Sequence, residues 1–140
     1  MSHLHDYIST FISVAEDCPA TEASAPPVRP NKVSAANVHH RMIVDEAGQH
    51  TQSRILFAAF LNAKGHDPSE HPEGGELWTQ FWSKGQPCLR CSALGKRYGW
   101  GLHFDAQGRV RAVPVDSPDY ARFAADSGLV QKKAMRSKRT

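Results

Sequence analysis

The spacing of apolar residues changes along this chain, which restricts the folds that it can adopt. Near the N-terminus, residues 7–15 and 38–44 alternate apolar and polar side chains, as half-buried strands do. In the centre, apolar residues recur at helical spacing from about residue 51 to 64 and from 75 to 84. The chain therefore predicts two strands followed by two helices. The second helix carries two neighbouring ridges, formed by Leu77, Trp78, Phe81 and Trp82.

A second group of strand signals follows. Residues 99–104 and 109–115 predict a hairpin around a four-residue turn, and residues 88–93 before it predict a short strand. Residues 117–119 combine a cap, a proline and an acid, which is typical of a helix start. A final strand is predicted over 129–135. Together these segments predict an α+β fold, in which a largely antiparallel sheet has about three helices packed on one face.

The length of 140 residues is typical of one domain. Residues 20–32, rich in Pro and Ala, predict a surface loop, and residues 132–140 form a basic tail. No apolar run approaches the roughly 20 residues needed to cross a bilayer, so no membrane partner is expected. We also find no signal-peptide pattern and therefore expect a cytoplasmic protein. Three cysteines, an odd number, favour reduced thiols over a disulfide framework.

Charge is unevenly distributed, although the net charge is only +3. Residues 45–76 contain six acids and two bases, whereas residues 84–111 contain six bases and one acid. The tail at 132–140 adds bases without an acid. The first half therefore carries the negative charge and the second half the positive charge.

Residues 84–103 form the most unusual segment, because bases and aromatic residues alternate there with glycines. Glycine lets a backbone approach a ligand, Arg and Lys bind phosphates, and aromatic side chains at strand spacing can stack on a base. The competing interpretation is a glycine-rich turn into a strand whose aromatic residues fill the core. On the functional interpretation, the segment binds nucleic acid or a phosphorylated small molecule. The predicted ligand-binding residues are Lys84, Arg90, Lys96, Arg97, Tyr98 and Trp100.

Two residues are weaker candidates for catalysis. Cys88 and His103 would act as nucleophile and base if the fold placed them side by side. Cys88 and Cys91 also form a lone C-x-x-C motif, which lacks the second pair of ligands that zinc requires. We therefore predict that the protein needs neither a metal nor another cofactor.

Four short segments resemble those of a known group of proteins. They are residues 16–19 (EDCP), 83–90 (SKGQPCLR), 96–101 (KRYGWG) and 133–139 (KAMRSKR). In this order, and over nearly the whole chain, they resemble a small bacterial family of uncharacterised single-domain proteins, a domain of unknown function. The resemblance implies a bacterial origin and a single domain, and it implies no activity. Cys91 departs from the small non-cysteine residue that we associate with its position.

Three functional hypotheses follow from the sequence. The first is a binding module for an anionic ligand, and the second is a small enzyme that uses Cys88 and His103. The third is an interaction protein whose acidic and basic halves contact a partner or a second copy in a homo-oligomer. Salt-sensitive binding, loss of activity after alkylation of Cys88 and a concentration-dependent mass would distinguish them.

Overall fold

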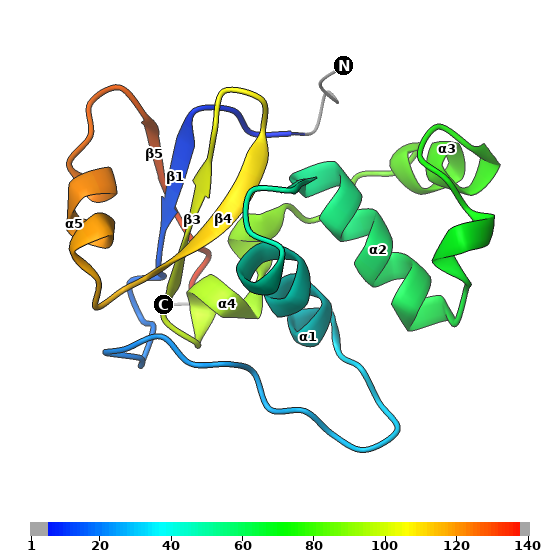
Figure 1. Cartoon of the computed structure of the whole chain (residues 1–140), viewed down its shortest axis with the longest axis horizontal. Coiled ribbons are helices and arrows are strands. Elements are labelled where there is room, and N and C mark those ends of the chain that lie inside the picture. Colours follow the sequence, from blue (N-terminus) through cyan, green and yellow to red (C-terminus); the bar gives the residue numbers. More distant parts are fainter. Residues whose placement is uncertain (1–5, 138–140) are drawn as a thin grey trace.

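A five-stranded sheet organises the chain, and a computed structural model describes it for residues 6–137 (Figure 1). The strand order is β2-β4-β3-β1-β5, and only the pairing between β1 and β5 is parallel. The predicted α+β class with a largely antiparallel sheet is therefore confirmed. The strands are β1 (Thr10–Ser13), β2 (His50–Thr51), β3 (Trp100–Phe104), β4 (Arg109–Pro114) and β5 (Val130–Lys133).

One face of the sheet carries the main core. Ile12, Leu102, Phe104 and Val110 are at most 1% exposed there. They pack against residues of α1 (Ala35–His40), α2 (Gln52–Lys64) and α4 (Ala93–Lys96). Because side chains alternate along a strand, the neighbouring residues of β1 and β3 point to the other face.

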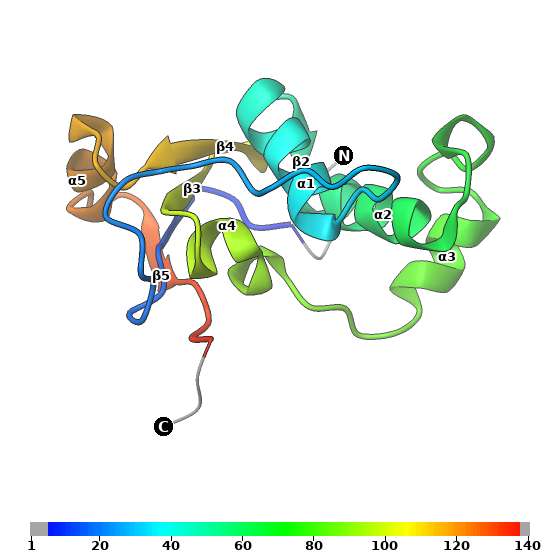
Figure 2. The same ribbon diagram turned by 90° about the horizontal axis from the view of Figure 1, so that it is seen from below.

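That other face is covered by α5 (Pro118–Ala124), which Ser117 caps as predicted. Phe11 of β1 packs there against Tyr120 and Phe123. Gly101 makes this close contact possible, since a Cβ at that position would lie 2.8 Å from the rings of Phe11 and Tyr120. Helices thus lie on both sides of the sheet, and the described chain contains five α-helices rather than about three (Figures 1 and 2).

The central helices match their predicted positions. Thr51 caps α2, and Gly65 ends it in the left-handed conformation with φ of 71°. The short η2 (Pro68–Glu70) leads to α3 (Glu76–Trp82), whose aromatic residues form a second cluster with α2. This cluster stands apart from the sheet and consists of Phe57, Leu61, Trp78 and Phe81, with Leu56, Phe60, Leu77 and Trp82 at its border.

The strand predicted over 38–44 is wrong, because these residues are helical. They belong to α1 and to a following π-helical turn, η1 (Arg41–Asp45). Ser34 accepts a hydrogen bond from the backbone of Asn37, and the Asn37 side chain accepts one from the backbone of Ser34, which fixes the helix start. Val38 and Met42 face the core because four residues also separate neighbours on one helical face.

The short strand predicted over 88–93 is also wrong. A 3₁₀ turn, η3 (Leu89–Cys91), and α4 replace it, and Ser92 caps α4. The amide of Leu89 donates to the side chain of Gln52 at 2.9 Å rather than to a neighbouring strand. The backbone N–H groups of this segment therefore form hydrogen bonds with helix caps and with one buried glutamine instead of with a neighbouring strand.

Candidate functional site

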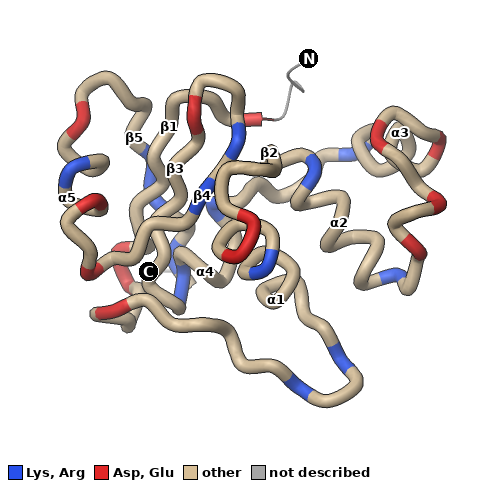
Figure 3. The backbone as a smooth tube through the Cα atoms, viewed as in Figure 1, with Lys and Arg blue, Asp and Glu red and all other residues tan. Residues whose placement is uncertain are grey.

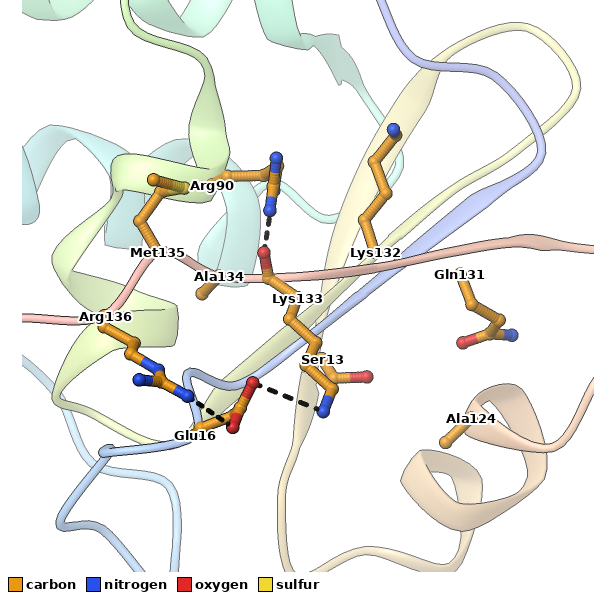
Figure 4. A pocket seen from close by; sticks show the side chains of 10 residues that line it. All are labelled: Ser13, Glu16, Arg90, Ala124, Gln131, Lys132, Lys133, Ala134, Met135 and Arg136. Atoms are coloured by element: carbon orange, nitrogen blue, oxygen red, sulfur yellow. Dashed lines mark hydrogen bonds and ion pairs between the residues drawn. The ribbon is translucent and has the colours of Figure 1, made fainter. Parts of the chain in front are cut away.

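A groove of about 880 Å³ runs beside β5 at the parallel edge of the sheet (Figure 4). We call it the C-terminal groove. Its cationic side chains come from two places far apart in the sequence, namely η3 and the segment that begins with β5. The lining residues are Ser13, Glu16, Arg90, Ala124, Gln131, Lys132, Lys133, Ala134, Met135 and Arg136.

Backbone hydrogen bonds hold these segments together. β5 pairs in register with β1, and the amide of Ala134 then donates to the carbonyl of Ser13 at 2.8 Å. The amide of Met135 donates to the carbonyl of Arg90 at 2.7 Å. In return, Nε of Arg90 donates to the carbonyl of Lys133 at 2.7 Å. The guanidinium of Arg90 is thereby fixed against the edge of β5.

Four cationic side chains line the groove, and two of them contact the carboxylate of Glu16, whereas Arg90 and Lys132 point away from it (Figure 4). Arg136 lies 2.9 Å and Lys133 lies 3.7 Å from Glu16, as the dashed lines in Figure 4 show. The hydrogen bond from Arg136 and the positive charges of Arg136 and Lys133 lower the pKa of Glu16, so it stays ionised. Arg90 and Lys132 form no ion pair with any residue in the described part of the chain. The groove therefore keeps an excess of positive charge.

Lys132 connects the groove to the main core. Its ammonium lies 5.4 Å from the centre of the Tyr7 ring, close enough for a cation–π contact. The Tyr7 hydroxyl donates to Sγ of Cys88 at 3.2 Å. Burial, followed by this hydrogen bond, raises the pKa of Tyr7 to about 12. Tyr7 is therefore a neutral hydrogen-bond donor at neutral pH.

Cys88 and His103 do not come together. Cys88 contacts Tyr7, which packs on the core face of the sheet. The ring of His103 stacks on Phe123 of α5, with centroids 4.3 Å apart, on the opposite face. Burial and the charge of Arg111 lower the pKa of His103. The sheet thus separates the two side chains that the catalytic hypothesis would need side by side.

The predicted basic and aromatic segment is dispersed. Arg90 lies in the C-terminal groove, whereas Lys84 is exposed after α3 and Lys96 ends α4. The indole of Trp100 donates to the carbonyl of Ser24 at 2.7 Å and so anchors the loop over residues 20–32. Trp100 is therefore occupied by a contact within the protein.

Arg97 and Tyr98 line a separate cavity of about 290 Å³. Arg29 and Lys32, from the loop before α1, share this cavity with them. Tyr98 and Trp100 do not present one stacking surface, because Gly99 between them has φ of 81° and ends the extended conformation. We call this second site the Arg97 cavity.

The distribution of charge follows these positions (Figure 3). Acidic residues gather around η2 and α3, at the end of the molecule formed by the helices. Basic residues follow β5 and the segment after it. The basic tail predicted from the sequence thus begins inside the sheet, while Lys138 and Arg139 lie outside the described residues.

Metal dependence can be tested directly. Between residues 6 and 137, no three His, Cys, Asp or Glu side chains gather as a set of metal ligands. We predict that a chelator leaves the melting temperature of the purified protein unchanged, because the fold uses an apolar core. Metal analysis should find less than one zinc per chain. One tightly held zinc per chain, with a lower melting temperature after chelation, would contradict this prediction.

Within the described residues, no helix is both long enough and apolar enough to cross a membrane.

The fold and the groove define a class: a small α+β protein with a mostly antiparallel sheet and a basic groove along its one parallel edge. A family model described as a family of unknown function (DUF6157) matches residues 2–140, and the chain belongs to that family. No curated protein and no solved structure matches it. Three of the four segments quoted for the family resemblance contribute to the C-terminal groove, through Glu16, Arg90 and residues 133–136.

Proposed function

We propose that this protein binds a phosphate-bearing anion in the C-terminal groove. The observation that carries the proposal is that four cationic side chains line one groove, in which Glu16 is the one carboxylate among the described lining residues and contacts only two of them. The four are Arg90, Lys132, Lys133 and Arg136. The sequence placed the anion site in residues 84–103, and of that segment only Arg90 takes part.

The geometry suits exchange of Glu16 for a phosphate. The ion pairs of Glu16 are about half exposed, and such pairs typically contribute only about 0–1 kcal/mol. An incoming phosphate offers more acceptor oxygens than the carboxylate that it displaces. Arg90 uses Nε for the carbonyl of Lys133, which leaves its two terminal nitrogens for a bidentate contact with the anion.

The residues that line the groove also favour binding of phosphate groups over binding of nucleobases. None of the described residues that line the groove is aromatic, so they offer no surface on which a nucleobase could stack. A phosphorylated small molecule and the backbone of a nucleic acid share the chemistry that these residues bind. Their salt dependence separates them, because each neutralised phosphate of a nucleic acid releases counterions.

The Arg97 cavity is a second candidate for the same activity. Three basic residues, Arg29, Lys32 and Arg97, line it together with Tyr98, and no carboxylate between residues 6 and 137 does. This cavity retains the predicted ligand-binding residues Arg97 and Tyr98. It is about one third the volume of the C-terminal groove, and its bases come partly from a loop without helix or strand.

Two matched double variants test the proposal. Lys133→Gln with Arg136→Gln removes two charges from the groove, and Lys96→Gln with Arg97→Gln removes two from α4 and the Arg97 cavity. Both variants have the same net charge, so long-range attraction changes equally in both. Binding of labelled single-stranded DNA, RNA and ATP is measured at low salt by anisotropy and calorimetry. We expect the groove variant to bind at least about tenfold more weakly, since one charge-assisted hydrogen bond contributes about 1.5–3 kcal/mol.

The control variant should change affinity by less than about threefold, which is the size of a surface electrostatic effect. The opposite order would move the site to the Arg97 cavity. If no probe binds the parent protein more tightly than about millimolar, the proposal is wrong. A steep salt dependence would identify nucleic acid as the ligand, and a shallow one a phosphorylated small molecule.

A further inference from the structure

A second kind of cavity, with the opposite chemistry, lies between the helices. Its volume is about 310 Å³, and it opens between α1, α2 and the connection from α3 to η3. Leu56, Phe60 and Phe81 line it, and none of the lining residues in the described part of the chain is an acid, lysine or arginine. Cavities of this size with mostly apolar walls and a few polar groups are the usual form of small-molecule sites.

One of the polar groups that line this cavity is a buried histidine, beside Gln86, Ser92 and two cysteines. His39 is 8% exposed, and its Nδ1 lies 2.8 Å from the hydroxyl oxygen of Ser92. The Ser92 hydroxyl already accepts a hydrogen bond from the amide of Leu94, and its proton has no other acceptor among residues 6–137. Ser92 therefore donates to Nδ1 of His39.

This contact assigns the proton of the His39 ring to Nε2. Burial lowers the pKa of His39 to about 4, so the ring is neutral at physiological pH. Nε2 forms no hydrogen bond with another residue in the described part of the chain. His39 thus adds to the cavity lining an N–H donor on a ring that Ser92 holds in place.

We infer that this cavity binds a small uncharged molecule that is largely apolar and carries one hydrogen-bond acceptor for Nε2 of His39. A cavity of about 150 Å³ holds benzene, so this one suits a molecule of about twelve heavy atoms. A charged ligand would lose its hydration without meeting an opposite charge. The site shares no residue with the C-terminal groove or the Arg97 cavity, so its test is independent of the proposed function.

Three probes of similar size test the inference on the full chain. Acetophenone has the expected chemistry, ethylbenzene lacks the carbonyl oxygen, and benzoate carries a charge. Chemical shifts of labelled protein are followed by NMR as each probe is added. We expect acetophenone to shift residues that line the cavity, saturating with a dissociation constant on the order of 1 mM or tighter. Ethylbenzene should bind about two- to tenfold more weakly, because it cannot accept a hydrogen bond, and benzoate more weakly still.

Two neighbouring alanines of α2 provide a matched pair of variants. Ala59 lines this cavity, whereas Ala58 lines a different one on the other side of the helix. Ala59→Leu should abolish acetophenone binding by filling the cavity, and Ala58→Leu should leave it unchanged. Cys91→Trp provides a second block at an exposed rim position, where a larger side chain does not disturb the core.

Several results would overturn the inference. One is an absence of saturable shifts in the lining residues, and another is equal affinity for acetophenone and ethylbenzene. A third is unchanged binding in both Ala59→Leu and Cys91→Trp. Failure of phosphate ligands to bind would have no bearing on it.

Discussion

Phe81→Ala is expected to lower the free energy of unfolding by about 3–5 kcal/mol, the usual cost of removing a buried aromatic side chain. Phe81 is 8% exposed, and its ring lies 4.8 Å from that of Phe60 and 4.9 Å from that of Trp82. Because these residues form a cluster apart from the sheet, few neighbours can move to fill the space. Thermal melts and urea titrations measure the loss, which we expect to lower the melting temperature by roughly 10 °C.

Gln80→Ala is the control for this prediction. Gln80 is the preceding residue of α3 and is exposed, so its replacement should change stability by at most about 0.5 kcal/mol. If Phe81→Ala melts at the temperature of the parent protein, α3 contributes little to the fold. The aromatic cluster would then be available as a binding surface.

Acidification from pH 7 to pH 4 is expected to remove about 3 kcal/mol of stability through His39 alone. Burial lowers the pKa of His39 from 6.5 to about 4 in the folded protein, while the unfolded chain binds a proton near pH 6.5. Above pH 6.5 both states are neutral and His39 has no effect. As the pH falls from 6.5 to 4, only the unfolded state gains the proton, so stability falls, and below pH 4 the loss is complete.

His39→Gln isolates this effect, because glutamine does not titrate. The difference in unfolding free energy between parent and variant, measured by urea titration at each pH, should change by about 3 kcal/mol across this window. The pKa values of His103 and Glu16 are also lowered. Their contributions to the pH dependence of stability are the same in parent and variant, so they cancel in the difference. Parallel stability curves for the two proteins would show that His39 titrates normally in the fold.

The sequence predicted the parts of the fold whose signals are local. The hairpin of β3 and β4, the cap at Ser117 and the helix from Thr51 to Gly65 each depend on turn or cap residues next to the element. The strand prediction for residues 38–44 was wrong because Val38 and Met42 would share one face of a strand and also share one face of a helix. The cap that decides between them is at Ser34, outside the alternating run.

The candidate site could not be predicted from the sequence, because it depends on contacts between residues that lie far apart along the chain. Glu16 and Arg136 are 120 residues apart in the sequence and meet because β5 pairs in parallel with β1. The sequence indicated the basic residues at 132–136 only as a tail, and it gave no signal that they begin as a strand beside Arg90. The dispersal of Arg97, Tyr98 and Trp100 depends likewise on the turn at Gly99 and on the loop that Trp100 anchors.

The position of β5 also bears on how the sheet avoids aggregation. During synthesis, β1 leaves the ribosome long before β5, and one of its edges stays open until β5 is made. β1 is among the most apolar segments of the protein, with Phe11 and Ile12 almost completely buried in the final fold. An open apolar edge invites pairing with another chain, and lysine on an edge strand discourages it. Once β5 pairs with β1, this edge of the sheet carries Lys132 and Lys133, which discourage pairing with a second copy.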